Sequence, residues 1–180
     1  MKFKIIEFEK LPSTQQKLVE LAKEKKVKPW TVIVAKEQTE GRGREEGRIW
    51  FSAKGGLYFS VLLPSLCIED VELLSILLSF SVAKVLKEKF NVEIWIKLPN
   101  DIYLNQKKIC GILTQNFFVG KDTLFTVAGI GLNTNLEDFP EDLKEKATSL
   151  KIELKREIDN KEILEEILKE ISKNILAISR

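Results

Sequence analysis

Apolar residues recur at helical spacing in two long stretches of the chain. Residues 69–90 and 157–178 carry valines, leucines and isoleucines three and four positions apart, which would share one face of a helix. In residues 69–90, acidic side chains stand at the start and lysines at the end, as the helix dipole favours. A shorter helix is predicted after Ser13 or Thr14, because either can cap its N-terminus, and it should end before Pro29.

Apolar runs bounded by turn residues predict strands. They cover residues 3–8, 30–35, 57–63, 94–97, 102–104, 107–118 and 123–130. Predicted turns at 105–106 and 120–122 join the last three into an antiparallel meander, whereas 132–150 is predicted to be irregular with a short helix near 141–146. This order predicts a single α+β domain over residues 1–180, with a mixed, mostly antiparallel sheet flanked by helices.

The composition is that of an ordinary globular protein of 180 residues, 44% hydrophobic and 31% charged. The net charge of +2 excludes bulk attraction to polyanions, although not a local basic patch. Residues 73–85 are the most apolar stretch, but serines and a lysine interrupt it, and it falls short of the roughly 18 to 20 apolar residues that cross a membrane. The N-terminus is too short and too charged for a secretory signal, so a cytoplasmic location is expected.

Histidine is absent from the sequence, which excludes Ser-His-Asp and Cys-His catalysis and His-ligated metal sites. Acid–base chemistry must therefore use Asp, Glu, Lys, Tyr or Cys. The two cysteines, Cys67 and Cys110, lie far apart in apolar surroundings and form no CxxC motif. We expect both to be buried, reduced thiols in a reducing compartment.

A polar loop at residues 38–50 is the first candidate for chemistry. Its centre interleaves glycines and arginines: Gly41, Arg42, Gly43, Arg44, Gly47 and Arg48. Glycine lets backbone N–H groups turn toward an anion and arginine donates two parallel hydrogen bonds, so a phosphate or carboxylate ligand fits. The spacing matches neither a P-loop nor a dinucleotide fingerprint, and a solvated basic loop remains the alternative.

The second candidate is the Pro99-Asn100-Asp101 break in an apolar run, with Lys108 seven residues after Asp101. An Asp and a Lys on opposed strands of one hairpin can face each other across it. In a site, the lysine would neutralise an anion and the aspartate would orient or deprotonate an amine. The alternative is a turn with an ordinary hairpin ion pair.

Three weaker signals complete the set of candidates. Gly129 and Gly131 permit close approach of a ligand to a strand, and Asn133 could hydrogen-bond a base or ribose, although a plain strand exit explains them equally well. The Ser13-Thr14-Gln15 segment caps a helix and could also bind a urea or amide group. Trp50 could stack on an adenine or simply anchor the loop to the core.

In this order, these motifs resemble the catalytic domain of biotin protein ligases over about residues 1 to 135. The matching elements are Ser13-Thr14-Gln15, Gln38-Thr39, Gly41-Arg42-Gly43-Arg44, Trp50-Phe51, Gly55-Gly56-Leu57-Tyr58, Lys97-x-Pro99-Asn100-Asp101, Lys108-x-x-Gly111-Ile112-Leu113 and Gly129-Ile130-Gly131-x-Asn133. The resemblance implies a fold like that of class II aminoacyl-tRNA synthetases and biotin synthetases. It also implies a homodimer that pairs through a sheet edge.

The activity that the resemblance implies has two steps. Biotin's carboxylate attacks the α-phosphate of MgATP, giving biotinyl-5′-AMP and pyrophosphate, and a lysine of a biotin carboxyl carrier protein then takes the biotin. ATP and biotin are substrates, and Mg²⁺ is expected to bind through the nucleotide phosphates with no protein ligands. No nucleic-acid or membrane partner is expected.

The residue roles carried over from the family fall into three groups. The implied catalytic residues are Lys108, Asp101 and Arg44, with Asp101 acting on the incoming lysine. The implied biotin-binding residues are Ser13, Thr14, Gln15, Gln38, Arg42, Gly43, Arg44, Lys108 and Gly111. The implied adenylate-binding residues are Arg42, Arg44, Arg48, Trp50, Lys97, Asn100 and Asn133.

The sequence departs from the family pattern in several places. Leu98 stands where the family usually has Trp, and Glu45-Glu46 adds one residue before Gly47, which leaves the role of Arg48 open. About twelve residues precede the Ser-Thr-Gln motif, so we expect neither a DNA-binding helix-turn-helix domain nor repressor activity. An SH3-like C-terminal domain is likewise not expected.

Three rival functions remain at this stage. A lipoate or octanoate ligase or transferase shares the fold, but the Gly-Arg-Gly-Arg loop argues against it. A non-catalytic biotin- or nucleotide-binding module is disfavoured because Asp101 and Lys108 are both retained. A nucleic-acid-binding domain fits poorly with the net charge of +2.

Overall fold

A single mixed sheet forms the centre of the molecule. The computed structural model describes residues 2–45, 47–64, 71–119 and 122–178. In spatial order the seven strands are β1 (Lys4–Phe8), β2 (Thr31–Ala35), β3 (Leu57–Leu63), β7 (Asp122–Leu132), β6 (Lys107–Val119), β5 (Asp101–Leu104) and β4 (Ile94–Lys97). Only the β1–β2 pair is parallel among these strands, so the predicted α+β class with a mostly antiparallel sheet is confirmed.

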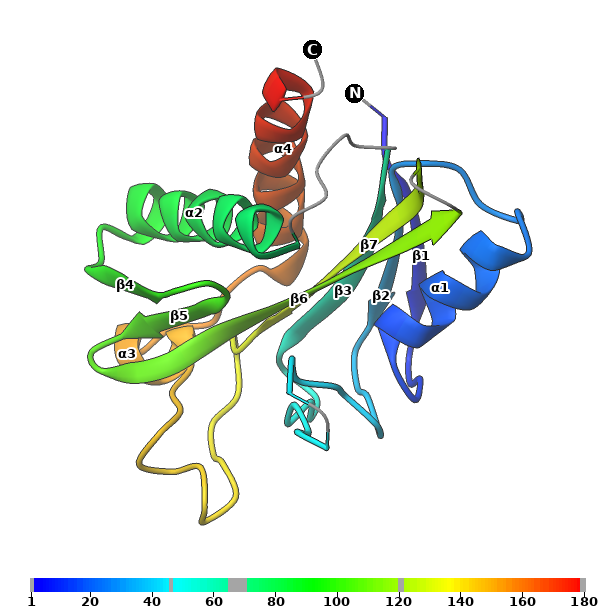
Figure 1. Cartoon of the computed structure of the whole chain (residues 1–180). Coiled ribbons are helices and arrows are strands. Elements are labelled where there is room, and N and C mark those ends of the chain that lie inside the picture. Colours follow the sequence, from blue (N-terminus) through cyan, green and yellow to red (C-terminus); the bar gives the residue numbers. More distant parts are fainter. Residues whose placement is uncertain (1, 46, 65–70, 120–121, 179–180) are drawn as a thin grey trace.

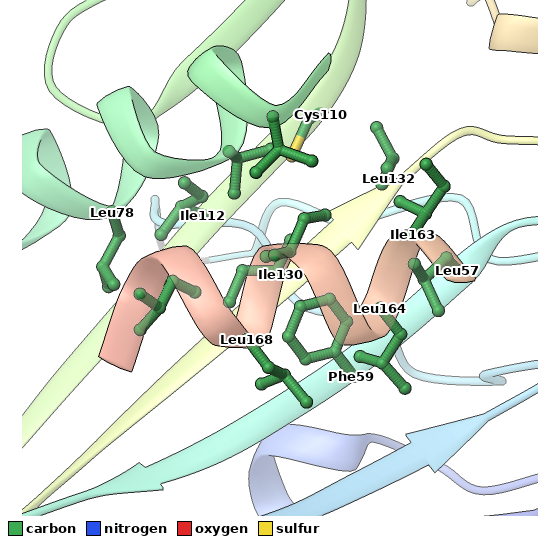
Figure 2. Close-up of a cluster of buried hydrophobic side chains, with 14 of the residues drawn as sticks. Leu57, Phe59, Leu78, Cys110, Ile112, Ile130, Leu132, Ile163, Leu164 and Leu168 are labelled. Atoms are coloured by element: carbon green, nitrogen blue, oxygen red, sulfur yellow. The ribbon is translucent and has the colours of Figure 1, made fainter. Parts of the chain in front are cut away.

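The helices cover the two faces of the sheet unequally. Helices α2 (Val71–Phe90) and α4 (Asn160–Ile178) pack together on one face of the sheet (Figure 1). Helix α1 (Thr14–Lys23) lies by itself on the other face, near β2, β3 and β7. Side chains of β3, β6 and β7 meet α4 in the main hydrophobic cluster, shown in Figure 2. A smaller cluster lies beneath α1.

Alternation along β3 separates the two faces. Phe59 and Val61 belong to the main cluster, whereas Leu62 packs beneath α1. Because successive side chains of a strand point to opposite faces, Tyr58 and Ser60 lie on the face that carries α1. The α1 face, left open beyond that helix, is therefore where polar side chains of the sheet can meet a ligand.

Most predicted elements are present within a few residues of the expected bounds. The predicted helix at 141–146 is wrong, since those residues form successive turns. The backbone carbonyl of Lys108 accepts from the N–H of Thr148 at 3.0 Å, and the backbone N–H of Lys108 donates to the carbonyl of Lys146 at 2.8 Å. Residues 146–148 therefore run beside β6. Helix α3 (Leu150–Leu154), capped by Ser149, was not predicted.

Two smaller differences concern element ends. Strand β7 continues to Leu132, beyond the predicted end at residue 130. Helix α4 begins at Asn160 rather than 157, because the Asp159 carboxylate accepts from the N–H groups of Lys161 and Glu162.

Cys67, residues 69–70 and most of the predicted 120–122 turn lie outside the described residues. Of the helices that are described, none combines the length and apolar character needed to cross a bilayer.

Candidate active site

The N-terminus of α1 supplies a neutral hydrogen-bonding cluster. The Thr14 N–H donates to Gln38 Oε1 at 2.8 Å, and the Thr14 and Ser60 hydroxyls lie 2.9 Å apart. The Ser60 hydroxyl also lies 3.1 Å from Gln15 Oε1, to which it can donate. Ser13 caps the helix by accepting from the N–H of Gln16. The four residues Ser13, Thr14, Gln15 and Ser60 are almost fully buried, so their mutual hydrogen bonds are shielded from bulk solvent.

The same cluster extends to the arginine-rich loop. Gln38 Nε2 donates to Ser52 Oγ at 2.9 Å, and Ser52 donates to the carbonyl of Trp50 at 3.0 Å. On its other side Gln15 Nε2 donates to Gln115 Oε1 at 3.1 Å. These bonds fix the orientation of the side-chain amides of Gln15 and Gln38 beside the small cavity.

Residues 41–45 and 47–50 lie against each other as two short arms. Arg42 pairs with Ile49, the Gly43 N–H donates to the carbonyl of Arg48 at 2.8 Å, and the Trp50 N–H donates to the carbonyl of Gly41 at 2.9 Å. The described residues of the predicted polar loop form no helix and only isolated bridges, so the loop is confirmed, and its two arms are hydrogen-bonded to each other. The two arms present their arginines beside the neutral cluster, where an anion attached to a neutral ligand would lie.

Trp50 lies on a pair of glycines. Gly111 of β6 and Gly131 of β7 are directly opposite each other in the sheet, and a Cβ added at either would overlap the indole ring. The ammonium of Lys108 lies 5.2 Å from the ring centroid, within cation–π range. The indole Nε1 is buried and has no hydrogen-bond partner among the described residues. Two glycines therefore let an aromatic ring lie flat on the sheet inside the site.

Asp101 and Lys108 face each other, as predicted. Lys108 Nζ lies 2.7 Å from Asp101 Oδ1, an ion pair rather than an aligned hydrogen bond, and both side chains are largely shielded from solvent. The register shifts between Ile102 and Tyr103, which places Lys108 opposite Tyr103. The pair borders a cavity, so it is more than a surface pairing between two strands.

Two cavities meet at Trp50 and Lys108. The smaller, of about 50 Å³, is lined by the predicted residues Ser13, Thr14, Gln15, Gln38, Arg42, Gly43, Arg44, Trp50, Asn100, Lys108 and Gly111. The larger, of about 590 Å³, is lined by the predicted residues Arg48, Trp50, Lys97, Asp101, Lys108 and Asn133. Every predicted site residue therefore borders one cavity or both.

Some side chains of the site were not predicted. Ser60 and Ser52 complete the neutral cluster, and Phe139 and Ala147 line the larger cavity. Ser60 carries a signal that sequence reasoning could have used, because it is the lone hydroxyl besides Tyr58 in the apolar run of β3. Phe139 and Ala147 come from a turn-rich segment whose path the sequence does not predict.

Burial decides which groups can exchange protons. Burial raises the pKa of the Tyr58 hydroxyl, which donates to the carbonyl of Ala53, and raises that of the Cys110 thiol. Both therefore stay protonated and take no part in acid–base chemistry. Cys110 is buried and free, as predicted. Among the described residues no cluster of His, Cys, Asp and Glu could hold a metal ion.

Asn133 lines the larger cavity and carries a buried acceptor without a partner among the described residues. Its side-chain N–H donates to the carbonyl of Thr148 at 3.0 Å, whereas its Oδ1 is buried and has no partner among the described residues. Asn133 and Trp50, which carry this buried acceptor and a buried donor, both line the larger cavity. Unpaired buried polar atoms are costly, so such a pair marks where a ligand would supply the missing partners.

Comparison with known proteins places the chain in a family. The model of the biotin/lipoate A/B protein ligase family matches residues 7–133. The bifunctional ligase/repressor BirA of Bacillus subtilis is 38% identical over 144 residues, which cover 78% of this chain and 44% of that protein. The chain thus spans less than half the length of this curated relative.

Solved structures agree over nearly the whole chain. A biotin protein ligase from Aquifex aeolicus in complex with biotin and ATP is 38% identical with a TM-score of 0.86, covering 98% of this chain and 72% of that one. The Leishmania major ligase in complex with biotinyl-5-AMP is 25% identical with a TM-score of 0.80, covering 100% of this chain and 78% of that one. The chain belongs to the biotin/lipoate A/B protein ligase family.

Proposed function

We propose that this chain is an ATP-dependent biotin protein ligase. It would activate biotin as biotinyl-5′-AMP and then pass the biotin to a lysine of a biotin carboxyl carrier protein. The observation that carries the proposal is the junction of the two cavities at Trp50 and Lys108. The small cavity combines the neutral hydrogen-bonding cluster with Arg42, Arg44 and Lys108, as a ligand with a neutral head and a reactive carboxylate requires.

The neutral cluster of the small cavity suits the head group of biotin. A ureido ring offers two N–H donors and one carbonyl acceptor, and Thr14, Gln15, Gln38 and Ser60 provide fixed hydroxyl and amide groups. The dithiolane of lipoate has no hydrogen-bonding group and would form no such bond with these groups. A site built to hydrogen-bond its substrate rejects an analogue that lacks those groups by several orders of magnitude, about 10⁴-fold.

The first step joins two anions. A biotin carboxylate oxygen attacks the α-phosphorus of ATP, the new P–O bond forms as the bond to the bridging oxygen breaks, and pyrophosphate leaves. Arg42, Arg44 and Lys108 line the small cavity and would cancel the repulsion between carboxylate and phosphate. Lys108 borders both cavities, so it would contact both reacting groups.

The nucleotide would occupy the larger cavity. Adenine carries both an amino donor and ring-nitrogen acceptors, which match the unpaired Asn133 Oδ1 and Trp50 Nε1. Lys97 and Arg48 border the same cavity and would bind phosphate oxygens, while Asn100 borders the smaller one. Mg²⁺ would arrive on the triphosphate, held by its oxygens rather than by the carboxylates of the chain.

The second step needs a base for the incoming lysine. The carrier lysine attacks the mixed anhydride as a neutral amine, an amide bond forms, and AMP leaves. Asp101 borders the larger cavity, where it would position this amine and accept its proton. The apposition of Asp101 to Lys108 supports this role, because Lys108 keeps the carboxylate at the reacting end of the cavity.

The wider assembly forms part of the same proposal. Residues 1–180 would act as one catalytic domain in the cytoplasm, as a homodimer. Strands β1 and β4 stand at the two ends of the strand order, so either offers an edge for pairing with a second copy. Sedimentation of the purified chain at several concentrations tests the dimer separately from the activity.

Pyrophosphate release from MgATP tests the proposed function. Purified protein is offered biotin, lipoate or neither, and the pyrophosphate released is measured against enzyme concentration. A single near-stoichiometric burst with biotin alone supports the proposal. Release with lipoate instead moves the chain to the lipoate branch of the family, and no release from a folded sample leaves a binding module. EDTA added before ATP should abolish the burst.

A further inference from the structure

Helix α2 carries buried serines that the mechanism above does not use. Burying a hydroxyl is costly unless it is hydrogen-bonded, so each serine on this helix needs a partner. Three of them are at most 5% exposed and reach a different element: Ser75 lies 2.6 Å from Thr114 of β6, Ser79 donates to the carbonyl of Pro99, and Ser81 accepts from Asn174 of α4. The serine that reaches the active site is Ser79.

Ser79 bonds the turn that carries Asp101. Its hydroxyl lies 3.0 Å from the carbonyl oxygen of Pro99 and 2.9 Å from that of Ser75, so the two acceptors share one proton. Pro99 is the middle residue of the turn between β4 and β5, and α2 packs against both strands (Figure 1). The contact therefore ties the turn to a long, well-packed helix.

The opposite side of the turn is tied to β6. The side chain of Asn100 donates to the carbonyl of Ile112 at 3.1 Å, and the N–H of Ile112 donates to the carbonyl of Asn100 at 2.9 Å. Pro99 is thus held by α2 and Asn100 by β6, and the next residue is Asp101. The direction of the Asp101 carboxylate depends on both attachments.

We infer that Ser79 is a positioning residue for the transfer step, acting through the Pro99 carbonyl on Asp101. The inference rests on the proposed function. The backbone of Lys108 is placed by β6 and by its pairing with Ala147, neither of which involves Ser79. Its ammonium also contacts Trp50 besides Asp101. Loss of the Ser79 hydroxyl would therefore shift Asp101 while leaving the backbone of Lys108 in place. It should slow transfer to the carrier lysine more than formation of the adenylate.

Single-turnover assays of the two steps test this inference. The pyrophosphate burst reports adenylation, and decay of pre-formed biotinyl-5′-AMP on a carrier protein reports transfer. Ser79→Val removes the hydroxyl, and Ser79→Thr keeps it on a side chain of the same shape. Ser81→Val is the matched control, because Ser81 is equally buried and also bonds the carbonyl four residues earlier, but its other partner lies in α4. Thermal unfolding midpoints of all variants show whether each is folded.

The outcomes separate positioning from stability. We expect S79V to transfer at least about tenfold more slowly with a burst rate within about twofold of the wild type, since small misplacements at a reacting group cost up to about a hundredfold. S79T should recover most of the transfer rate, and S81V should alter neither step. Equal slowing of both steps, the same effect from S81V, or an unchanged S79V overturns the inference. A wild-type protein that fails to release pyrophosphate with biotin overturns the proposed function as well.

Discussion

The two ends of the candidate site are built in opposite ways. The neutral end consists of Thr14, Gln15 and Ser60, which are at most 5% exposed and pair with one another before any ligand binds. The charged end consists of loop and turn residues, among them Arg48, whose side chain is 67% exposed. The neutral end is organised before a ligand binds, whereas the charged end has charges and unpaired polar atoms for which a ligand would supply the partners.

The difference follows from what each end has to bind. A neutral ring is distinguished only by directional hydrogen bonds, which require side chains fixed to within a few tenths of an ångström. An anion is attracted over longer distances, so cations on adaptable segments suffice. A helix terminus and central strands therefore supply the neutral end, whereas loops can supply the charged end.

The largest effect is expected where the two ends meet. Lys108→Met removes the cation that borders both cavities, and we expect pyrophosphate release to fall by about 10²- to 10³-fold, as when one stabilising donor of a transition state is lost. Rapid-quench measurement of the burst provides the number. Lys107→Met is the control, because the neighbouring ammonium bonds the carbonyl of Lys144 away from the reacting groups. A comparable loss in both variants would contradict a specific role of the Lys108 ammonium in the adenylation step.

Two glycines on β7 both line the small cavity but contact different side chains of the site. An alanine Cβ at Gly129 would lie 2.6 Å from Gln15 Oε1, whereas one at Gly131 would overlap the indole of Trp50. We expect Gly129→Ala to raise the KM for biotin and Gly131→Ala to raise the KM for ATP, each by about tenfold, as overpacking costs of order 1–3 kcal/mol predict. The measurement is a matrix of both KM values in both variants. Parallel changes in both substrates would mean that the ends do not act separately.

The same contrast explains what the sequence could predict. Strands β3 and β4 match their predicted bounds, because apolar runs ended by turn residues leave few alternatives. Ser13, Asp101 and Lys108 were found as well, since a helix cap and a hairpin each constrain neighbours that are close in sequence. The resemblance of the motifs to a family then assigned them a chemistry that spacing alone left open.

Contacts between segments far apart in the chain could not be predicted from the sequence. The bonds from Gln15 to Gln115 and from Gln38 to Ser52 depend on how strands and loops assemble in space. The prediction of a helix near residues 141–146 is wrong for the same reason. Residues 146–148 pair with the backbone of Lys108, and this distant contact outweighs local helical preference. Local patterns thus identified most elements and residues that border the two cavities, but not the hydrogen bonds within the neutral end.

A smaller effect is expected from one hydroxyl at the neutral end. Ser60→Ala leaves Thr14 and Gln15 without their shared partner, which costs about 1 kcal/mol or roughly fivefold in affinity. The KM for biotin should rise by that factor while the KM for ATP stays constant, as read from initial rates of pyrophosphate release. Ser60→Thr keeps the hydroxyl and is the companion variant. An ATP effect as large as the biotin effect would contradict the separation of the two ends.

The smallest effect belongs to Arg48, the residue whose role the lengthened loop left open. Its guanidinium lies 3.1 Å from the carboxylate of Glu45, and both side chains are about two-thirds exposed or more, so solvent weakens this pair as it does other surface ion pairs. Arg48→Ala should raise the KM for ATP by no more than about threefold and leave the KM for biotin unchanged. Glu45→Ala should act in the opposite direction, because it frees Arg48 for phosphate. If Glu45→Ala weakened ATP binding instead, the Arg48–Glu45 pair would be holding the loop in shape, and the charged end would be more organised than its exposure indicates.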